Sequence, residues 1–379
     1  MCARTLDKAA VTVVGAGIIG LAVAARLADK HSPLYILEKN DSFGRETSSR
    51  GSETIHAGIY YPQGSLKATT CVDGNALLYE LCQRHNLPVQ RTGKLIVATN
   101  EAELAELDTL LQLGKANGAR DLHMLTRRQV KEVEPNVEAA GAVFSPTSGV
   151  VDSFSLMRYF LARAAEGGAT TAYSTRVVAV SKEVDGYVVG VEDGSGSFEF
   201  KTAALVNCAG LHAHEIAQAA GIDIDKAQYR VHYCKGEYFS VGNGKNRLVS
   251  RLVYPVPDPT SGGMGIHNVF DVEGRMLLGP NARYVDEIDY RVDESQRQTH
   301  LDSVKPFLPF IEAEDLEPDI AGIRPKLRGP GDGFRDFVIE HEEDRGLPGM
   351  VNLIGIESPG LTSAPAIARL VADMIKEAA

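Results

Sequence analysis

Six residues near the beginning of the chain have the composition and spacing of a phosphate-binding turn. Glycine occupies the first, third and sixth positions of the run Gly15-Ala16-Gly17-Ile18-Ile19-Gly20. In such a turn the first glycine allows the sharp bend, the second lets the backbone approach a phosphate, and the third lets a helix pack on the preceding strand. Free N–H groups and the dipole at the helix N-terminus favour the negative charge. The run therefore predicts a site for a pyrophosphate.

The elements that must position this turn can be recognised on both sides of it. Residues 11–14 have the apolar, β-branched character of a buried parallel strand, and residues 21–27 have the composition of a helix. A second apolar run, 34–37, ends in Glu38 and Lys39, and the Glu38 carboxylate can accept hydrogen bonds from a ribose. Strand, turn, helix, strand and acid form a dinucleotide-binding βαβ unit, which suits NAD and FAD alike.

A polar loop, residues 45–52, follows soon after this acid and can meet the pyrophosphate from its other side. An ordinary surface loop is the alternative interpretation. The candidate contacts in the loop are Thr47, Ser48, Ser49 and Ser52.

A second helix start, near the end of the chain, favours FAD over NAD. Ser358–Ser363 leads into an expected closing helix over 364–377. Free N–H groups there can stabilise negative charge at N1–C2=O of a reduced flavin. Simple capping by Thr362 or Ser363 is the alternative interpretation. An NAD-dependent dehydrogenase would leave this element without a role.

Two side chains are suited to reaction and substrate binding. His56 lies among small and aromatic residues in Ile55–Tyr61, and an imidazole with a pKa near neutrality can act as a general base. Arg324, in Gly322–Pro325, can grip a carboxylate with two parallel hydrogen bonds. A core histidine and an ion-paired arginine are the alternative interpretations. Weaker candidates of the same kind are Lys235, Tyr238, Tyr254 and His267.

The remaining pattern predicts a nucleotide-binding sheet interrupted by a more antiparallel region. Helices are expected over 66–84 and 152–165 and after an N-cap at Asn100, and strands over 93–99, 176–181, 187–192, 198–200 and 351–356. The apolar run 205–210 is expected to rejoin the parallel sheet. The fold class is therefore α/β, with a Rossmann-like parallel sheet and a second region that carries a mixed or antiparallel sheet and helices.

Composition and charge limit the class of protein and its partners. The 379 residues suit two domains, and the net charge of −11 argues against binding nucleic acid. The five cysteines include no C-x-x-C pair, which argues against disulfides and zinc, so no metal is expected. Residues 11–28 are too short and interrupted to span a membrane, and the first ten do not resemble a signal peptide. We expect a cytoplasmic location, with peripheral contact to the inner face of a membrane left open.

These motifs together resemble the D-amino-acid-oxidase-like (DAO) superfamily of FAD-dependent oxidoreductases, and within it the L-2-hydroxyglutarate dehydrogenase family. The matching segments keep the family order and span nearly the whole chain. They are Val14–Ala22, Ile55–Tyr61, Ser65–Ala68, Gly93–Ala98, Asn207–Gly210, Lys235–Tyr238, Tyr254–Asp258, Gly265–His267, Leu278–Ala282 and Ser358–Ser363. The segments most specific to this family are Ile55–Tyr61, Tyr254–Asp258 and Leu278–Ala282. The glycine-rich turn and Gly322–Pro325, in contrast, occur across the superfamily.

The resemblance implies an oxidoreductase that acts on a CH–OH group. Hydride would pass from C2 of a small anionic 2-hydroxy acid to flavin N5, leaving a 2-oxo acid, and the electrons would go on to a quinone, another acceptor or oxygen. FAD is implied to be non-covalent, since no cysteine stands where the sarcosine-oxidase branch attaches its flavin. The implied FAD-binding domain comprises residues 1–90, 140–215 and 325–379, and the substrate-binding domain comprises 91–139 and 216–324.

The resemblance also implies roles for individual residues. His56 would take the hydroxyl proton or bind the hydroxyl, and Arg324 would hold a substrate carboxylate. Lys235, Tyr254 and His267 would lie on the substrate side. Further implied cofactor contacts are Ile55, Val177, Val178, Ala209, Gly210, Gly360, Leu361 and Thr362, in addition to His56 and Arg324.

Two positions depart from the family pattern and keep other substrates open. Glu53 stands where the family usually has glycine, and an ionised carboxylate there would repel a dianionic substrate. Lys235 stands where arginine is common, so a bidentate fork is lost. The alternatives are an amino-acid or amine oxidase or a glycerol-3-phosphate dehydrogenase of the same superfamily, more remotely an NAD-dependent dehydrogenase, and a flavin-binding protein without turnover.

Overall fold

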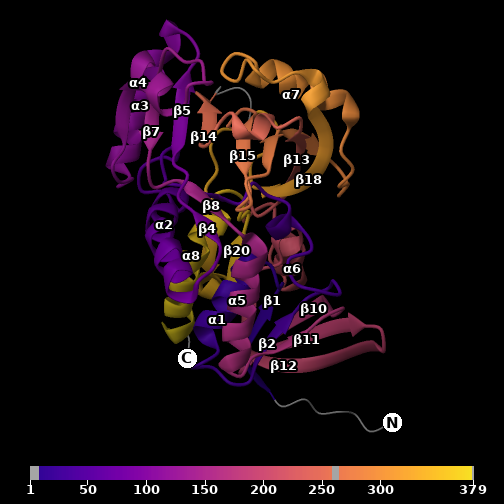
Figure 1. Cartoon of the computed structure of the whole chain (residues 1–379). Helices are drawn as coiled ribbons and strands as arrows, with labels where there is room; N and C mark the ends of the chain where they lie inside the picture. Colours follow the sequence, from indigo (N-terminus) through magenta and orange to yellow (C-terminus); the bar gives the residue numbers. More distant parts are fainter. Residues whose placement is uncertain (1–7, 258–263, 378–379) are drawn as a thin grey trace.

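The computed structural model describes residues 8–257 and 264–377, so Cys2 and Asp258 lie outside the described residues. Figure 1 shows a lower part, which contains both ends of the described chain, and an upper part made largely from the middle of the sequence. The chain passes between the two parts several times.

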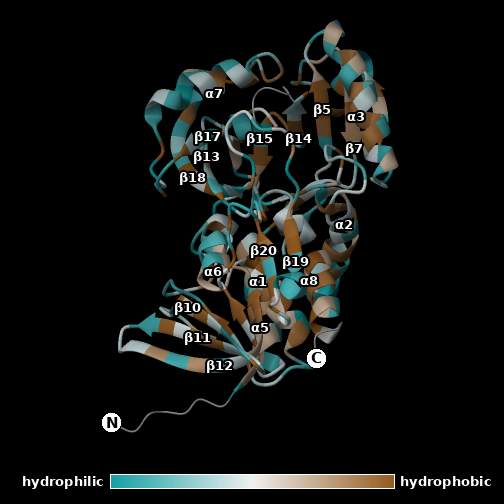
Figure 2. Cartoon of the chain, turned by 180° about the vertical axis from the view of Figure 1, so that it is seen from behind, coloured by the Kyte–Doolittle hydropathy of each residue, from teal (hydrophilic) through white to brown (hydrophobic). Residues whose placement is uncertain are grey.

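The lower part is built on a twisted sheet of eight strands within the described residues. Its parallel strands are β1 (Ala9–Val14), β2 (Leu34–Leu37), β9 (Thr170–Ala172), β12 (Gly196–Asn207) and β20 (Met350–Ile354), with β1 hydrogen-bonded between β2 and β12. β10 (Arg176–Glu183) and β11 (Gly186–Asp193) extend β12 as antiparallel strands, and β19 (Val338–His341) pairs with β20. Figure 2 shows apolar residues concentrated on the central strands.

Helices cover both faces of this sheet. On one face α1 (Ile18–Leu27) contacts α5 (Ser153–Glu166) and α8 (Gly360–Glu377), and α2 (Leu66–His85) packs against α8. Ala22 and Ala24 are buried in this layer, where their small side chains allow close packing. On the other face α6 (Ala213–Ala219) contacts β10, β12 and β20. The parallel sheet therefore has the two covered faces that a buried α/β sheet requires.

The upper part contains two sheets. In the first, β13 (His232–Val241) pairs antiparallel with β16 (Met276–Gly279), β17 (Arg283–Val285) and β18 (Leu316–Lys326), and β15 (His267–Phe270) pairs with β16. The second has the order β14 (Leu252–Pro255), β5 (Lys94–Ala98), β7 (Gly141–Ser145) and β6 (His123–Thr126). β14 and β5 run parallel, and the other pairs are antiparallel.

Helices and a small sheet complete the upper part and its junction with the lower one. α3 (Leu104–Ala116) and α4 (Arg127–Val133) contact the second sheet, and α7 (Arg297–Val304) contacts the first. Asn100 caps the turn before α3 through bonds from the Ala102 and Glu103 N–H groups. β3 (Thr54–Ile55), β8 (Gly149–Val151) and β4 (Val89–Gln90) form a three-stranded sheet.

The α/β fold class and the βαβ unit are confirmed, and two element boundaries are wrong. The segments 198–200 and 205–210 are not two strands, because the chain stays extended between them and forms the single strand β12. The closing helix begins at Gly360 rather than Ala364. One strand pairing also bears on the division into domains: β7 lies in the segment 140–215, yet pairs with β5 of the upper part.

Candidate active site

A cavity of about 650 Å³ lies at the carboxyl ends of the parallel strands. β1, β2, β12 and β20 each end where a lining segment begins, at Gly15, Glu38, Cys208 and Ile356. This edge is where ligands bind in open α/β sheets. The cavity extends from there to strands β13, β14, β15 and β18 of the upper part, so its lining changes character along its length.

At the sheet end, the glycine turn is built for close approach of its own backbone. Gly15 has φ +102°, and a Cβ placed on it would lie 2.5 Å from the Cys208 carbonyl oxygen. A Cβ on Gly20 would lie 2.0 Å from the Gly15 carbonyl oxygen, so Gly20 lets α1 pack on the turn. Gly17 precedes α1 and has no side chain to cap it, and only the Ile18 N–H is taken by a side chain from elsewhere, Ser48. The helix N-terminus therefore keeps N–H groups for an anion.

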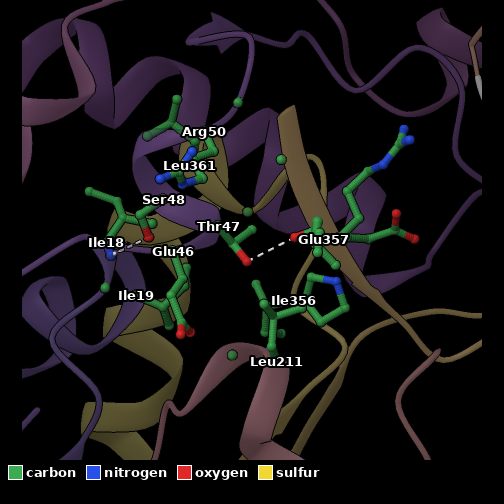
Figure 3. A pocket seen from close by; sticks show the side chains of 18 of the residues that line it. Ile18, Ile19, Glu46, Thr47, Ser48, Arg50, Leu211, Ile356, Glu357 and Leu361 are labelled. Carbon is green, nitrogen blue, oxygen red and sulfur yellow. Dashed lines mark hydrogen bonds between the residues drawn. The ribbon is translucent and has the colours of Figure 1, made fainter. Parts of the chain in front are cut away.

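The acid after β2 and the polar loop close around the turn. Glu38 Oε2 accepts a hydrogen bond from the Ala16 N–H at 2.9 Å, and Ser48 Oγ accepts one from the Ile18 N–H at 3.0 Å. Thr47 Oγ1 donates to the Ile323 carbonyl oxygen at 2.9 Å and so fixes the loop against β18. Figure 3 shows both the Ser48 and the Thr47 contacts. The loop is part of the site rather than an ordinary surface loop.

At the other end His56 and Ser358 meet, although they are 302 residues apart in the sequence. His56 Nε2 lies 3.1 Å from Ser358 Oγ, and both residues line the cavity. The His56 backbone N–H donates to Thr362 Oγ1 at 3.0 Å, and Thr362 Oγ1 donates to the Thr54 carbonyl oxygen. Burial, followed by the nearby positive charge of Lys94, holds the pKa of His56 well below its usual range. The ring is therefore neutral at neutral pH.

Arg324 presents its guanidinium from β18. Its Nη2 donates to the Asn281 and Lys235 carbonyl oxygens at 2.5 and 3.2 Å, and its Nε donates to the Cys234 carbonyl oxygen at 3.3 Å. Among the described residues no carboxylate pairs with it, so it keeps its positive charge for a ligand that enters the cavity. Because these three partners are uncharged carbonyl oxygens, they orient the guanidinium and leave its positive charge uncompensated.

Tyr254 and His267 form one wall of the cavity. Their rings stack with centroids 3.5 Å apart, and His267 Nδ1 lies 2.7 Å from the Gly265 carbonyl oxygen. Burial lowers the pKa of His267 to about 3 and raises that of Tyr254 far above 10. Both rings are thus uncharged, and they offer an apolar face beside the charged Arg324.

Most of the residues that the sequence singles out line this one cavity. They are Gly15, Gly17, Ile18, Ile19, Glu38, Lys39, Thr47, Ser48, Ser52, His56, Val177, Ala209, Gly210, Tyr238, Tyr254, His267, Arg324, Gly360 and Leu361. The residues that are not part of the lining are Ala16, Gly20, Ser49, Ile55, Val178, Lys235 and Thr362. Several of these support it from behind: Ala16 and Gly20 shape the turn, and Thr362 anchors His56 instead of capping α8.

Lys235 differs from the other candidates because its charge is already paired. Its Nζ donates to Asp289 Oδ2 at 3.3 Å and to the Arg291 carbonyl oxygen at 2.5 Å, and it lies 3.6 Å from Glu237 Oε1. The side chain is 3% exposed. A lysine held in this way has no free ammonium group for a substrate, so the expected substrate-side role has no support in the geometry.

Glu53 lines the cavity, but its carboxylate is already bonded to groups of the protein. Its Oε1 accepts hydrogen bonds from the Ser153 N–H and Oγ at 3.0 and 2.6 Å, at the start of α5. Burial raises the pKa of this carboxyl group. Its backbone has φ +53°, a left-handed conformation that glycine adopts more easily. Glu53 therefore combines a left-handed backbone with a carboxylate that is held by Ser153.

Sequence reasoning gave no role to Ser358 as a partner of His56 and none to Lys94 behind the wall. Neither has a local signal, because Ser358 reaches His56 through tertiary packing and Lys94 sits in an apolar strand. The sequence predicted a helix start at Ser358–Ser363 and a strand over 93–99, but neither prediction paired Ser358 with His56 or placed Lys94 behind the wall.

Comparisons with known proteins agree with this geometry. The family model described as FAD dependent oxidoreductase (DAO) matches residues 10–374. The chain belongs to this family. It is also 36% identical to the mitochondrial L-2-hydroxyglutarate dehydrogenase of Arabidopsis thaliana, over 98% of this chain and 84% of that protein. This member of the family is thus an FAD-dependent oxidoreductase.

Solved structures place the fold in the same group. The dithionite-reduced L-alpha-glycerophosphate oxidase of Mycoplasma pneumoniae, with FAD bound, superposes with a TM-score of 0.85 at 27% identity, covering 98% of this chain and 95% of that one. Glycine oxidase from Geobacillus kaustophilus superposes at 0.81 with 23% identity, covering 99% and 96%, and shows the shared fold. Within 8–257 and 264–377, no helix is long and apolar enough to cross a membrane.

Proposed function

We propose that this family member oxidises L-2-hydroxyglutarate to 2-oxoglutarate. The observation that carries the proposal is that one cavity holds a dinucleotide cradle, a neutral histidine and an arginine without a carboxylate partner among the described residues. The similarity to the Arabidopsis thaliana dehydrogenase supports this choice of substrate. When bound, FAD supplies the hydride acceptor of the reaction.

Arg324 binds a substrate carboxylate in this proposal. Three backbone carbonyls hold its Nε and Nη2, so the guanidinium has a fixed orientation before the substrate arrives. Preorganisation of this kind reduces the entropy lost on binding. A carboxylate on Arg324 places the adjacent C2 within the same cavity as His56.

His56 accepts the proton of the substrate hydroxyl at Nε2. Hydride leaves C2 with two electrons, the O–H bond breaks toward His56, and the C2–O bond becomes a carbonyl. The tautomer required has its hydrogen on Nδ1, which has no hydrogen-bond partner among the described residues. The Ser358 hydroxyl lies 3.1 Å from Nε2 and has to turn its own hydrogen away before Nε2 can accept the substrate proton. Tyr254 and His267 bound the substrate on one side and exclude water.

The cofactor contacts follow the cradle. Gly15, Gly17, Ser48 and the start of α1 would hold the pyrophosphate, Glu38 would hold a ribose, Val177 would meet the adenine end, and Leu361 would offer its N–H to the flavin pyrimidine. The Gly360 N–H already donates to the Glu357 carbonyl oxygen at 2.6 Å, so it is not free for the flavin. We propose that FAD is bound non-covalently. Acid precipitation, which should release all of the flavin, would test this.

We retain the discontinuous FAD-binding and substrate-binding domains. β7 is reassigned to the substrate-binding domain because it pairs with β5.

The electron acceptor and location belong to the same proposal. We propose transfer from the reduced flavin to a quinone or another acceptor, with oxygen as the alternative, in a reducing compartment and with peripheral contact to a membrane. The free, buried thiols of Cys71, Cys82, Cys208 and Cys234 suit such a compartment. Reoxidation rates with a soluble quinone and with oxygen distinguish the acceptors.

Anaerobic mixing of the purified holoenzyme with candidate substrates tests the function. We expect L-2-hydroxyglutarate to bleach the visible flavin band much faster than D-2-hydroxyglutarate, glycerol 3-phosphate, glycine or L-proline. Faster bleaching by glycerol 3-phosphate or an amino acid would replace the proposed substrate. A flavin that none of them bleaches would favour a non-catalytic role.

A further inference from the structure

Lys94 is buried in a place where a lysine has no evident structural use. It lies on β5, between β14 and β7, and its side chain is fully buried. Its Nζ has no hydrogen-bond partner and no carboxylate among the described residues. A buried, unpaired ammonium group is destabilising, and an apolar residue of similar length would fill the same space without that penalty.

The amino group rests on aromatic rings that form the cavity wall. Nζ lies 4.3 Å from the centroid of the Tyr254 ring and 5.1 Å from that of Tyr60. Tyr254 in turn stacks on His267, and both line the cavity. A cation over a ring face is attracted by the ring quadrupole, and this contact is stronger where water is excluded. The Tyr254 ring therefore has Lys94 on one side and forms part of the cavity wall.

Among residues 8–257 and 264–377, no negative charge faces Lys94 from the elements around it. The titratable groups there are Cys71 on α2, Tyr60 and His56 in the crossing segment, Tyr254 on β14 and His267 on β15. Burial raises the pKa of Cys71 to about 12 and keeps both tyrosines protonated. Burial also lowers the pKa of Lys94 to about 7, so both of its protonation states are accessible near neutrality.

We propose that Lys94 is a positioning residue that takes up a proton when an anionic substrate enters the cavity and then supplies the positive charge behind the Tyr254 wall. This proposal rests on the proposed function, since it needs an anionic substrate. The carboxylates of the substrate provide the counter-charge that the protein itself does not offer. Burial keeps the pKa of His56 low before the substrate arrives, and the Lys94 charge lowers it further once Lys94 is protonated.

Calorimetry of ligand binding tests the proton uptake without turnover. 2-Oxoglutarate, which cannot reduce the flavin, is titrated into oxidised holoenzyme in two buffers of different ionisation enthalpy. At pH 8 Lys94 starts mostly neutral, so we expect uptake of about half a proton or more. Lys94→Met should abolish this uptake. By linkage, uptake of about half a proton at pH 8 accompanies an affinity gain of about twofold, and the same pKa shift gives roughly tenfold at pH 6, so Lys94→Met should weaken 2-oxoglutarate binding by these factors.

The control is Lys182→Met. Lys182 Nζ also lies over a tyrosine ring, 5.6 Å from the Tyr187 centroid, but on β10, outside the cavity lining. The Lys182→Met variant should keep the wild-type proton uptake, affinity and rate.

The pH dependence of flavin reduction gives a second test of Lys94→Met. The acid limb of the rate profile should move to higher pH, because loss of a nearby cation raises the pKa of His56. Equal proton uptake at pH 8 in Lys94→Met and the wild type would overturn the proposal.

Two further measurements keep the proposal open to refutation. Flavin content and melting temperature show whether Lys94→Met folds, and replacing an unpaired buried cation should raise the melting temperature. Independently, the wild-type holoenzyme with 13Cε-labelled lysine should show a lysine signal that titrates near neutrality, and 2-oxoglutarate should raise its midpoint. No such signal would refute the Lys94 proposal. If the signal is present but 2-oxoglutarate does not bind, the proposal that L-2-hydroxyglutarate is the substrate is refuted. The proposed role of Lys94 as a counter-charge to that substrate is then refuted as well.

Discussion

The two ends of the cavity are built from different parts of the polypeptide. The sheet end is made mainly of backbone: glycines, helix N–H groups and one acid at the ends of parallel strands. The substrate end is made of side chains from segments far apart in the sequence, such as His56, Ser358 and Arg324. A backbone cradle depends on which residues lack a Cβ, whereas a side-chain constellation depends on tertiary packing. Substitutions should therefore separate cofactor binding from catalysis.

The largest effect is expected at the sheet end. Gly15→Val should abolish FAD binding and most of the soluble yield, because a Cβ there would lie 2.5 Å from the Cys208 carbonyl oxygen at φ +102°. Flavin absorbance per protein in the purified fraction measures this. Near-normal flavin content would mean that the cradle does not depend on the missing Cβ.

His56→Ala should separate the two ends most clearly. We expect flavin reduction to slow by roughly a hundredfold or more, with FAD still bound, because the proton acceptor is lost while the cradle is intact. Anaerobic stopped-flow absorbance gives the rate, and the flavin spectrum of the same sample reports the bound cofactor. Reduction at close to the wild-type rate would exclude His56 as the base.

Arg324→Lys should affect the substrate end through affinity. Lysine keeps the charge but cannot make the three carbonyl contacts and a forked carboxylate contact together, so substrate affinity should fall roughly tenfold. Melting temperature should change little. An unchanged dissociation constant for 2-oxoglutarate would remove Arg324 from the binding site.

The smallest effect is expected for Glu53→Gln. The carboxylate is engaged by Ser153, and the amide oxygen of glutamine can accept the same hydrogen bonds, so substrate affinity should change by less than about fivefold. Titration with 2-oxoglutarate measures it. A much larger gain in affinity would show that Glu53 repels the substrate after all.

The same contrast explains what the sequence could predict. Gly15–Gly20 and Glu38 follow one another within a single βαβ unit, so their spacing alone predicted the turn and its flanking elements. The contact between His56 and Ser358 crosses 302 residues, and the pairing of Lys235 with Asp289 arises only when the upper sheet folds. No local pattern encodes such contacts. The single strand β12 was split in two because its polar, solvent-facing residues interrupt the apolar run.

A single anaerobic turnover tests the central claim most directly. Holoenzyme is mixed with L-2-hydroxyglutarate without oxygen, and flavin bleaching and 2-oxo acid are measured in the same sample. The account predicts one molecule of 2-oxoglutarate for each flavin reduced, with no comparable reduction by the D enantiomer. Bleaching without 2-oxoglutarate, or no bleaching by a fully flavin-loaded protein, would contradict it.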